Sequence, residues 1–524
     1  MAIDIDGGVA WWQAGVVYQV YPRSFKDSTG DGVGDLQGIR SRLDHLVELG
    51  VDAVWISPIY PSPMADFGYD ITDHRDIDPL FGTLEDFGDL LEAAHGRGLK
   101  VLLDLVPAHT SDQHPWFVAS RSSRQDPKRD WYLWRDPSPD GGPPNNWVSE
   151  FGGPAWTFDE TTGQYYLHFY LRAQPALNWR NPEVRRAMFE VMGFWLDRGV
   201  DGFRVDAINH LVPDARLRDN PPDPDATPEM GPARQLIRRY TAHRPEVYEM
   251  VREMRTLADT YDGDRVLMGE AYGTLDQVMA YYGDAADGFH QPFNLQLIGA
   301  TWEPRGLAAM VDAYEAALPE GAWPNWVLGN HDRSRIASRV GAAQARVAAM
   351  LLLTLRGTPT IYQGDELGMA DVPIPPDAVQ DPWEKQVPGL GLGRDPVRTP
   401  IPWDGRAGAG FSTTEPWLPL GTDVASAAAQ VADPTSMLTL HRQLLHLRRR
   451  EPALSIGDYR TVSADDAVYV YERHHQGRHL VVALNLTGDD RPLDLDGEVL
   501  VTTHLDDPPL GLLRANEGRI LTTT

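Results

Sequence analysis

The chain contains no cysteine, which excludes disulfide bonds, cysteine–zinc sites and a cysteine nucleophile. It also has no uninterrupted apolar run of the roughly eighteen residues that a membrane helix needs. Its start, MAIDIDGGVAWWQAG, lacks the basic segment and apolar stretch of a signal peptide. We therefore expect a protein of a reducing compartment, the cytoplasm, with no membrane partner.

Positive charge is also scarce. The 524 residues include 47 Lys and Arg against 75 Asp and Glu, which gives a formal net charge of −28 at pH 7. Such an excess of negative charge repels nucleic acids and anionic membranes, so neither is expected as a partner. The composition is otherwise that of an ordinary globular protein, 42% hydrophobic and 23% charged, and the chain is long enough for several domains.

One unit recurs along the chain: an apolar helix, a glycine and a short apolar strand. The glycine predicts the left-handed turn that ends a helix, and the strands are apolar enough to be buried on both faces. Eight strands alternating with helices predict a (β/α)₈ TIM barrel. A doubly wound open sheet is the alternative, but no glycine-rich phosphate motif follows the first strand. The unit occurs at residues 43–58, 90–106, 194–206 and 350–366, with further strands expected at 16–22, 265–272, 287–294 and 325–332.

Two parts of the chain interrupt or follow this repeat. Residues 108–175 are rich in Pro, Gly, Trp and Asp without a convincing helix, and predict a loop-rich domain inserted after the third strand. Beyond a last helix, alternating strands predict a small antiparallel β domain over residues 451–524. The barrel is then expected to comprise residues 1–107 and 176–450.

The stretch GFRVDAINH carries the first chemical signal. Arg204 and Asp206 lie two apart on one predicted strand, so both side chains point to the same side of the sheet. A structural ion pair is enough to explain these two residues alone. Further polar residues, however, end other strands of the predicted barrel: His109, Glu270, His331 and Asp332. Three carboxylates converging at strand ends suit glycoside hydrolysis, which needs a nucleophile and a general acid.

Six motifs make the chain resemble the α-amylase family of glycoside hydrolases, specifically its α-glucosidase and oligo-1,6-glucosidase branch. They are DLVPAHTS, GFRVDAINH, GEAY, GNHDRSR, QGDELGM and GRDPVRTP. The resemblance implies that Asp206 is the nucleophile, Glu270 the acid/base, and Asp332 a third carboxylate that stabilises the transition state. It also implies contacts to the bound sugar from Arg204, His109 and His331.

The resemblance further implies a sugar site that is closed at one end. Asp66 and Tyr69 in ADFGYD match the residues that close it, and Arg398 in RTP matches the basic partner of the acid. A closed end implies an exo-acting α-glucosidase that releases one glucose at a time from small α-glucosides or oligosaccharides. Phe151 and Tyr170 are expected either to flank the sugar or, equally, to lie in the core of the inserted domain.

Three functions remain open. The first is hydrolysis with retention through a glucosyl-enzyme at Asp206, and the second is transglucosylation or sucrose isomerisation on the same site. The third is a non-catalytic transporter subunit, as one relative of this fold is; it would need a membrane segment and altered carboxylates, and neither is seen. Ala207 stands where the α-1,6-specific relatives have valine, so we expect a preference for α-1,4 bonds.

The segment DSTGDGVGD predicts a metal site. Five oxygen-bearing groups alternate around Gly32: the side chains of Asp27, Thr29, Asp31 and Asp35 and the carbonyl of Val33. Oxygen ligands at that spacing wrap a hard cation, although Gly38 replaces the bidentate glutamate of a standard calcium loop. An acidic surface turn is the alternative interpretation. Because the same loop holds calcium in the resembling α-glucosidases, we expect a structural Ca²⁺ here.

Overall fold

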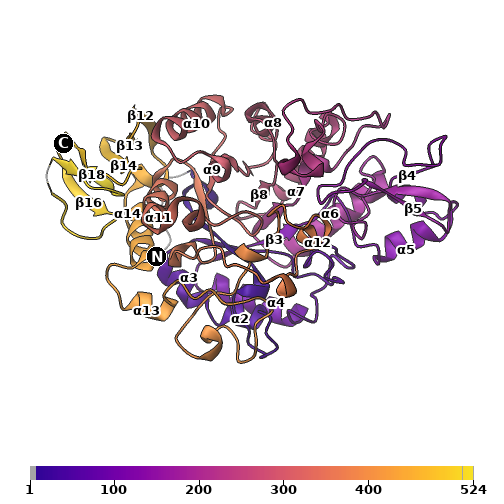
Figure 1. Ribbon diagram of the computed structural model, residues 1–524, viewed down its shortest axis with the longest axis horizontal. Helices are drawn as coiled ribbons and strands as arrows, with labels where there is room; N and C mark the ends of the chain where they lie inside the picture. The colour runs from indigo at the N-terminus through magenta and orange to yellow at the C-terminus, as the bar shows by residue number, and fades with distance from the viewer. Residues whose placement is uncertain (1–7, 510, 523–524) are drawn as a thin grey trace.

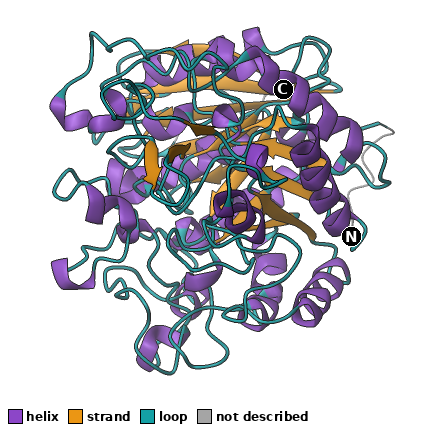
Figure 2. Cartoon of the chain, turned by 90° about the vertical axis from the view of Figure 1, so that its right-hand side faces the viewer, coloured by secondary structure: helices purple, strands orange, loops and turns teal. Residues whose placement is uncertain are grey.

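The largest sheet of the protein is a nearly closed barrel. The computed structural model describes residues 8–509 and 511–522. Eight parallel strands are hydrogen-bonded in the order β10-β11-β1-β2-β3-β7-β8-β9, and helices surround them (Figure 2), so the predicted (β/α)₈ fold is confirmed. The strands are β1 (Val17–Val20), β2 (Ala53–Ile56), β3 (Lys100–Leu105), β7 (Gly202–Val205), β8 (Val266–Gly269), β9 (Gln291–Pro292), β10 (Asn325–Val327) and β11 (Thr358–Tyr362).

Helices α3, α4, α6, α7, α10, α11 and α14 are the longer helices around the barrel. Their bounds are α3 (Leu43–Leu49), α4 (Leu84–His95), α6 (Pro182–Leu196), α7 (Pro245–Ala258), α10 (Pro304–Ala317), α11 (Ile336–Thr354) and α14 (Met437–Arg450). The remaining helices are α1 (Trp11–Ala14), α2 (Leu36–Arg40), α5 (Pro115–Ser122), α8 (Leu275–Ala280), α9 (Gln296–Gly299), α12 (Pro382–Gln386), α13 (Ala427–Val431) and α15 (Pro452–Ser455).

Helix α6 and the strand after it illustrate how the sequence builds the repeat. The side chain of Asn181 accepts the N–H of Glu183 as an N-cap, and proline fills the first helical position. The apolar face of the helix is buried, and Gly199 ends the unit with φ 96°. The other three predicted turn glycines also have positive φ: Gly50 (100°), Gly98 (80°) and Gly357 (121°). These turns return the chain to the barrel at the start of each following strand.

The inside of the barrel is filled by side chains. Apolar residues from several strands form one separate cluster there, which makes the barrel a packed core and leaves its chemistry to the strand ends. The cluster contains Val17, Ala53, Trp55, Leu102, Val266, Met268, Phe293 and Val327.

The segment after β3 forms the inserted structure that was predicted there. It contains a three-stranded antiparallel sheet in the order β4-β6-β5. The expectation of no helix was wrong, because α5 forms with the side chain of His114 accepting the N–H of Trp116 and a proline in its first turn. The strands are β4 (Trp134–Arg135), β5 (Trp156–Asp159) and β6 (Gln164–Leu167).

The C-terminal region is an antiparallel β structure at the opposite end of the long axis from the inserted sheet (Figure 1). Its five-stranded sheet, in the order β12-β13-β14-β18-β16, contacts α10 and α11. Within the described residues α11 alone is long and apolar enough to cross a membrane by length and composition, and 61% of the window tested is buried. The strands are β12 (Asp458–Ala464), β13 (Val468–His475), β14 (Arg478–Asn485), β15 (Arg491–Pro492), β16 (Glu498–Thr502), β17 (Leu512–Leu513) and β18 (Gly518–Thr522).

Candidate active site

The carboxyl ends of the barrel strands bring the three predicted catalytic carboxylates to one cavity. Asp206 directly follows β7, Glu270 directly follows β8, and Asp332 lies beyond β10. Because these strand ends meet at one face of the barrel, the side chains converge. The cavity that they line has a volume of about 360 Å³, which is a size typical of small-ligand sites.

Arg204 lies among several carboxylates and is only 2% exposed. It stands directly beside Asp104 in the register of β3 and β7. Its Nη1 donates to Asp104 Oδ1 and to Asp206 Oδ1, both at 2.6 Å, and its Nη2 lies 2.7 Å from Glu270 Oε1. One buried guanidinium therefore holds three carboxylates, and two of them, Asp206 and Glu270, line the cavity.

This arrangement changes how the carboxyl groups titrate. Burial raises the pKa of Asp206; Arg204 opposes that effect, but Glu270 and Asp104 add to it, so the pKa lies well above its ordinary value. Burial likewise raises the pKa of Asp104 to about 6, although Arg204 lowers it. Repulsion from neighbouring carboxylates thus adds to burial in raising the pKa of both Asp206 and Asp104.

Asp332 has the opposite environment. Its Oδ1 lies 2.8 Å from Arg398 Nη2 and 3.5 Å from Arg394 Nη1, and its Oδ2 lies 3.4 Å from His331 Nε2. Burial raises the pKa of Asp332, but His331, Arg398 and Arg394 outweigh burial and hold the pKa well below its usual range. Asp332 is therefore a carboxylate at neutral pH.

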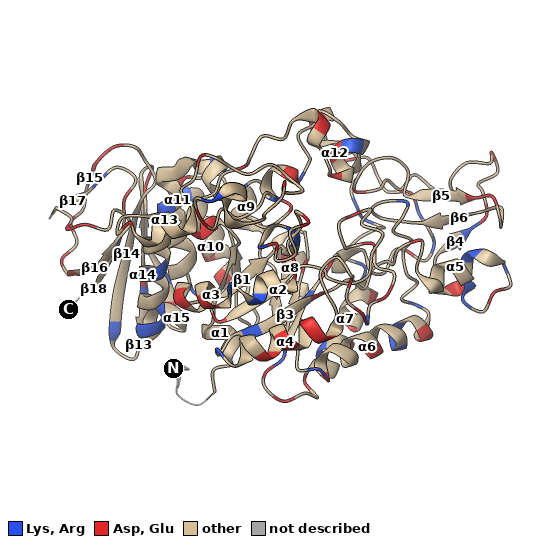
Figure 3. Ribbon diagram, turned by 90° about the horizontal axis from the view of Figure 1, so that it is seen from below, with Lys and Arg blue, Asp and Glu red and all other residues tan. Residues whose placement is uncertain are grey.

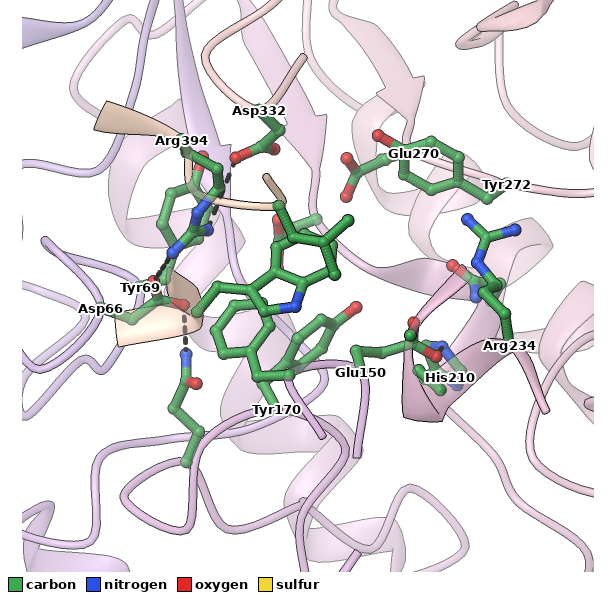
Figure 4. Close-up of a pocket in the computed structure, with 18 of the residues that line it drawn as sticks. Asp66, Tyr69, Glu150, Tyr170, His210, Arg234, Glu270, Tyr272, Asp332 and Arg394 are labelled. Atoms are coloured by element: carbon green, nitrogen blue, oxygen red, sulfur yellow. Dashed lines mark hydrogen bonds and ion pairs between the residues drawn. The ribbon is translucent and has the colours of Figure 1, made fainter. Parts of the chain in front are cut away.

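A buried ion pair closes one end of the cavity. Asp66 Oδ1 lies 2.7 Å from Arg394 Nη2, and these side chains are 5% and 6% exposed. Arg394 Nη2 also lies 2.7 Å from Asp381 Oδ1, and Gln174 Nε2 donates to Asp66 Oδ2 at 3.1 Å. Figure 4 shows Asp66 and Arg394 together on one side of the cavity. Fixed polar groups therefore wall off this end.

Tyr69 and two histidines complete the closed end. The Tyr69 hydroxyl lies 2.9 Å from His331 Nε2, and the two rings are stacked with their centres 5.6 Å apart. His109 Nε2 lies 3.1 Å from the carbonyl oxygen of Tyr69. Burial lowers the pKa of His331 to about 3 and the pKa of His109 to about 4. Both histidines are neutral at pH 7 and can hydrogen-bond a neutral sugar without adding charge.

Aromatic side chains form another wall of the cavity. Phe151 stacks on Trp383 of α12 with ring centres 5.2 Å apart, and Tyr170 meets Phe151 edge-on at 5.6 Å. All three line the cavity, and Tyr170 also packs against the apolar cluster of the inserted segment, so both alternatives stay open for it. Helix α12 lies between the barrel helices and the inserted sheet in the view of Figure 3.

The predicted basic partner of Asp66 needs correction. Asp66 pairs with Arg394, whereas Arg398 donates to the carbonyl of His331 and binds Asp332. Both arginines come from GRDPVRTP, and a short 3₁₀ turn over Asp395–Val397 separates them. That turn directs the two guanidinium groups to different carboxylates, which the matched motif alone did not distinguish.

The far end of the cavity was missed by the sequence analysis. It carries three arginines with one acid and one histidine, here called the arginine end: Glu150, His210, Arg234, Arg238 and Arg333. Glu150 Oε1 lies 3.2 Å from His210 Nε2, and Arg238 also contacts Glu150. Burial raises the pKa of Glu150, but Arg238, His210 and Arg234 lower it to about 2. The available signal was the arginine-rich run PARQLIRRYTAHR, which follows neither a helical nor a strand period.

The predicted calcium loop satisfies its own carboxylates. Asp27 accepts the N–H groups of Thr29, Gly30 and Gly32 at 2.7–2.9 Å and the hydroxyl of Ser412 at 2.6 Å. Asp35 accepts two hydrogen bonds from Ser28 and the N–H of Gly38, each at 2.7 Å. No group of three or more acidic or histidine side chains is arranged to hold a metal within residues 8–509 and 511–522. Carboxylate oxygens can accept such hydrogen bonds and bind a cation at the same time, so calcium binding stays a prediction.

Comparison with known proteins identifies the family. Residues 19–457 match the model of the α-amylase catalytic domain. The chain is 42% identical to a probable α-glucosidase of Rhizobium meliloti over 91% of its own length and 90% of that protein. It is 37% identical to an oligo-1,6-glucosidase of Heyndrickxia coagulans, over 97% of this chain and 99% of the relative.

Solved structures give the same result. An α-glucosyl transfer enzyme, XgtA, superposes with a TM-score of 0.93 at 40% identity, over 99% of this chain and 100% of the other. The trehalulose synthase MutB from Pseudomonas mesoacidophila MX-45 superposes with a TM-score of 0.89 at 35% identity, over 98% and 100% of the two chains. This chain therefore belongs to the α-amylase family and is a glycoside hydrolase of its α-glucosidase and oligo-1,6-glucosidase type.

Proposed function

We propose that this enzyme is an exo-acting, retaining α-glucosidase. It releases glucose from the non-reducing end of small α-glucosides through a covalent glucosyl-enzyme at Asp206, and prefers α-1,4 bonds. The observation that carries the proposal is the juxtaposition of the Asp206–Arg204–Glu270 group with a cavity end closed by Asp66 and Arg394.

The closed end supports release of one glucose at a time. Asp66 and Arg394 form a buried ion pair at this end of the cavity, which supports a site in which the glucose next to Asp206 is the terminal unit of the substrate. The carboxylate, the guanidinium and the neutral histidines offer donors and acceptors that suit the hydroxyl groups of a neutral sugar. A polysaccharide chain cannot thread through such a site.

The chemistry follows from two carboxyl groups on one cation. The carboxylate of Asp206 attacks C1 of the glucose while the C1–O bond breaks, and Glu270 gives its proton to the leaving oxygen. Glu270 then removes a proton from water as the water oxygen attacks C1, and the bond to Asp206 breaks. Two displacements at C1 retain its configuration. The cycle requires an ionised Asp206 and a protonated Glu270 at the start of the reaction.

Asp332 has a different task. Its low pKa keeps it negative while positive charge develops on C1 and the ring oxygen of the sugar. Arg398 and Arg394 hold its Oδ1, which fixes the direction of the carboxylate before substrate arrives. Such preorganised charge stabilises a transition state without reorganisation at the moment of reaction.

The preference for α-1,4 bonds rests on Ala207, and the structure adds a new aspect to that argument. Ala207 is 2% exposed and is not among the cavity-lining residues. It has φ 48°, and its N–H donates to Glu270 Oε2 at 3.1 Å. A β-branched residue at position 207 would strain the backbone at this φ. We infer that the small side chain of Ala207 acts on the linkage preference through the position of Glu270.

Transfer to a sugar instead of water is the second candidate function. The likeness to an α-glucosyl transfer enzyme and to a trehalulose synthase favours testing it. One panel separates the functions: maltose, isomaltose, sucrose, trehalose and nitrophenyl α-glucoside, with products identified at low and at high sugar concentration. We expect glucose as the main product from maltose. Mainly transfer products or sucrose isomers at low sugar concentration would favour the second function, and no cleavage of any substrate would end the proposal.

Calcium binding by the Asp27–Asp35 loop is a separate proposal. Binding to the folded state alone raises the melting temperature. A chelator should therefore remove bound calcium and lower the melting temperature. The kcat per folded molecule should stay the same. A chelated protein with unchanged metal content and melting temperature would contradict it.

A further inference from the structure

The arginine end of the cavity has an excess of positive charge. Arg234 and Arg333 both line the cavity, and neither forms an ion pair with a carboxylate in the described part of the chain. The single acid of this end, Glu150, is already engaged by His210 and Arg238. Arg234 is exposed and Arg333 is half-buried, so both guanidinium groups are accessible to a ligand in the cavity.

The guanidinium groups of the arginine end repel one another. Burial lowers the pKa of Arg234, Arg238 lowers it further, Glu150 opposes this, and Arg333 lowers it again. Arg333 lies 5.4 Å from the centre of the Tyr272 ring, a neutral partner. Figure 4 shows Arg234 and Tyr272 on the side of Glu270, across the cavity from Asp66. The two cations thus lie on the side of the cavity where the leaving group that Glu270 protonates would be.

A second cavity continues from this end. It has a volume of about 540 Å³ and shares Arg234, Tyr272, Asp332, Arg333 and Leu392 with the first. Its other carboxylate, Asp371, is engaged by the hydroxyl of Ser334 and the N–H of Arg335. A leaving group larger than one sugar therefore has space, with Arg234 and Arg333 at the junction.

We propose that Arg234 and Arg333 bind an anionic group, a phosphate or a carboxylate, on the leaving group of the substrate, which is the part that Glu270 protonates. Guanidinium groups bind both anions through charge-assisted, bidentate hydrogen bonds. The proposal rests on the proposed function, because it presumes that glucose occupies the closed end. It assigns the enzyme a substrate class, α-glucosides with an acidic aglycone, while the glucose unit itself stays neutral.

The competing explanation is that Arg333 only balances Asp332 and Glu270. Both carboxylates favour its charged form, after the larger effect of Tyr272. A balancing role would change the rate with neutral and anionic substrates alike. Recognition of an anion would change the ratio between them, so the ratio is the quantity to measure.

The experiment compares kcat/KM for 4-carboxyphenyl α-glucoside with kcat/KM for its uncharged methyl ester. A second pair, maltose with and without phosphate on its reducing-end sugar, distinguishes the two anions. The variants are Arg234→Met, Arg333→Met and the double variant, which keep an unbranched side chain and remove the charge. Arg239→Met is the matched control, because Arg239 is exposed on the same segment and lines neither cavity.

The wild type and Arg239→Met should prefer the anionic member of at least one pair by about ten- to a hundredfold, as charge-assisted hydrogen bonds imply. The double variant should lose that preference, and added salt should weaken it in the wild type. A wild type without preference for either anion, or a double variant that keeps it, overturns the inference while leaving glucosidase activity intact. Absence of cleavage of all four substrates would instead overturn the proposed function, and the inference with it.

Discussion

The two ends of the catalytic cavity use arginine in opposite ways. At the closed end Arg394 and Arg398 are buried and bound to the carboxylates of Asp66 and Asp332. At the arginine end Arg234 and Arg333 face the cavity without a carboxylate partner in the described residues. A paired arginine fixes the geometry of a site, whereas an unpaired one is available to a ligand. Under the proposed function, the closed end would hold a single sugar and the arginine end a variable leaving group.

The catalytic carboxyl groups and the arginine end differ in what supports them. Asp206 and Glu270 directly follow the barrel strands β7 and β8, whose register fixes their positions. Arg234 comes from the segment between His210 and α7, which contains only two short 3₁₀ turns, Pro228–Met230 and Pro232–Arg234. Loops on a rigid scaffold can change without disturbing the catalytic group. We therefore expect changes in the segment that carries Arg234 to alter the choice of leaving group more than the chemistry.

The largest effect should come from the carboxyl groups between the two ends. Asp206→Asn removes the nucleophile and Glu270→Gln removes the proton donor, so kcat should fall by several orders of magnitude for the first and by about 100- to 10,000-fold for the second. Steady-state kinetics with thermal unfolding as the folding check would measure this. Asp284→Asn is the control, because Asp284 is exposed and does not line the cavity. Near-native activity in either active-site variant would exclude the assigned roles.

The contrast between paired and unpaired arginines predicts that replacing them lowers the free energy of unfolding by different amounts. Arg394→Met leaves Asp66 buried with a charge and no cation beside it, so the free energy of unfolding should fall by about 3–5 kcal/mol. Arg234→Met breaks no ion pair and should change it by about 0.5 kcal/mol or less. Denaturant unfolding of both variants would measure the difference. Equal losses would remove the distinction between the two ends.

Ala207→Val tests how the bond to the leaving sugar is selected. We expect the wild type to prefer maltose to isomaltose, and the variant to shift the kcat/KM ratio toward isomaltose. The reason is that valine at φ 48° strains the backbone whose N–H binds Glu270. Kinetics of both proteins on both disaccharides decide the matter. An unchanged ratio, or a wild type that prefers isomaltose, would show that Ala207 does not select the linkage.

The smallest effect concerns pH. Because the pKa of Asp206 is raised, kcat/KM should fall as the pH drops through a value well above that of an ordinary aspartate. Asp104 contributes to this rise, so Asp104→Asn should lower the pKa of Asp206 and extend activity to lower pH. The pH profile of kcat/KM for the two proteins measures the shift. A limb that stays in place, or moves to higher pH, would contradict the electrostatic account.

Sequence alone predicted the parts of the site that the barrel repeat controls. Asp206 and Glu270 follow apolar strands. The apolar pattern shows where each strand ends, and in a barrel the carboxyl ends of the strands lie at the catalytic face. It did not separate Arg394 from Arg398, because a 3₁₀ turn between them directs the side chains. Nor did it find Glu150 or Arg234, which come from irregular segments whose positions depend on long-range packing. Patterns of period two or 3.6 carry no information about such loops.

The anomeric form of the released glucose tests the central claim most directly. Proton NMR during the first minutes of hydrolysis of 4-nitrophenyl α-glucoside distinguishes the α-anomer from the β-anomer before they interconvert. Two displacements at C1, through Asp206 and then water, predict that α-glucose appears first and that β-glucose follows only by mutarotation. Initial release of β-glucose would mean a single displacement by water, and would contradict the covalent glucosyl-enzyme.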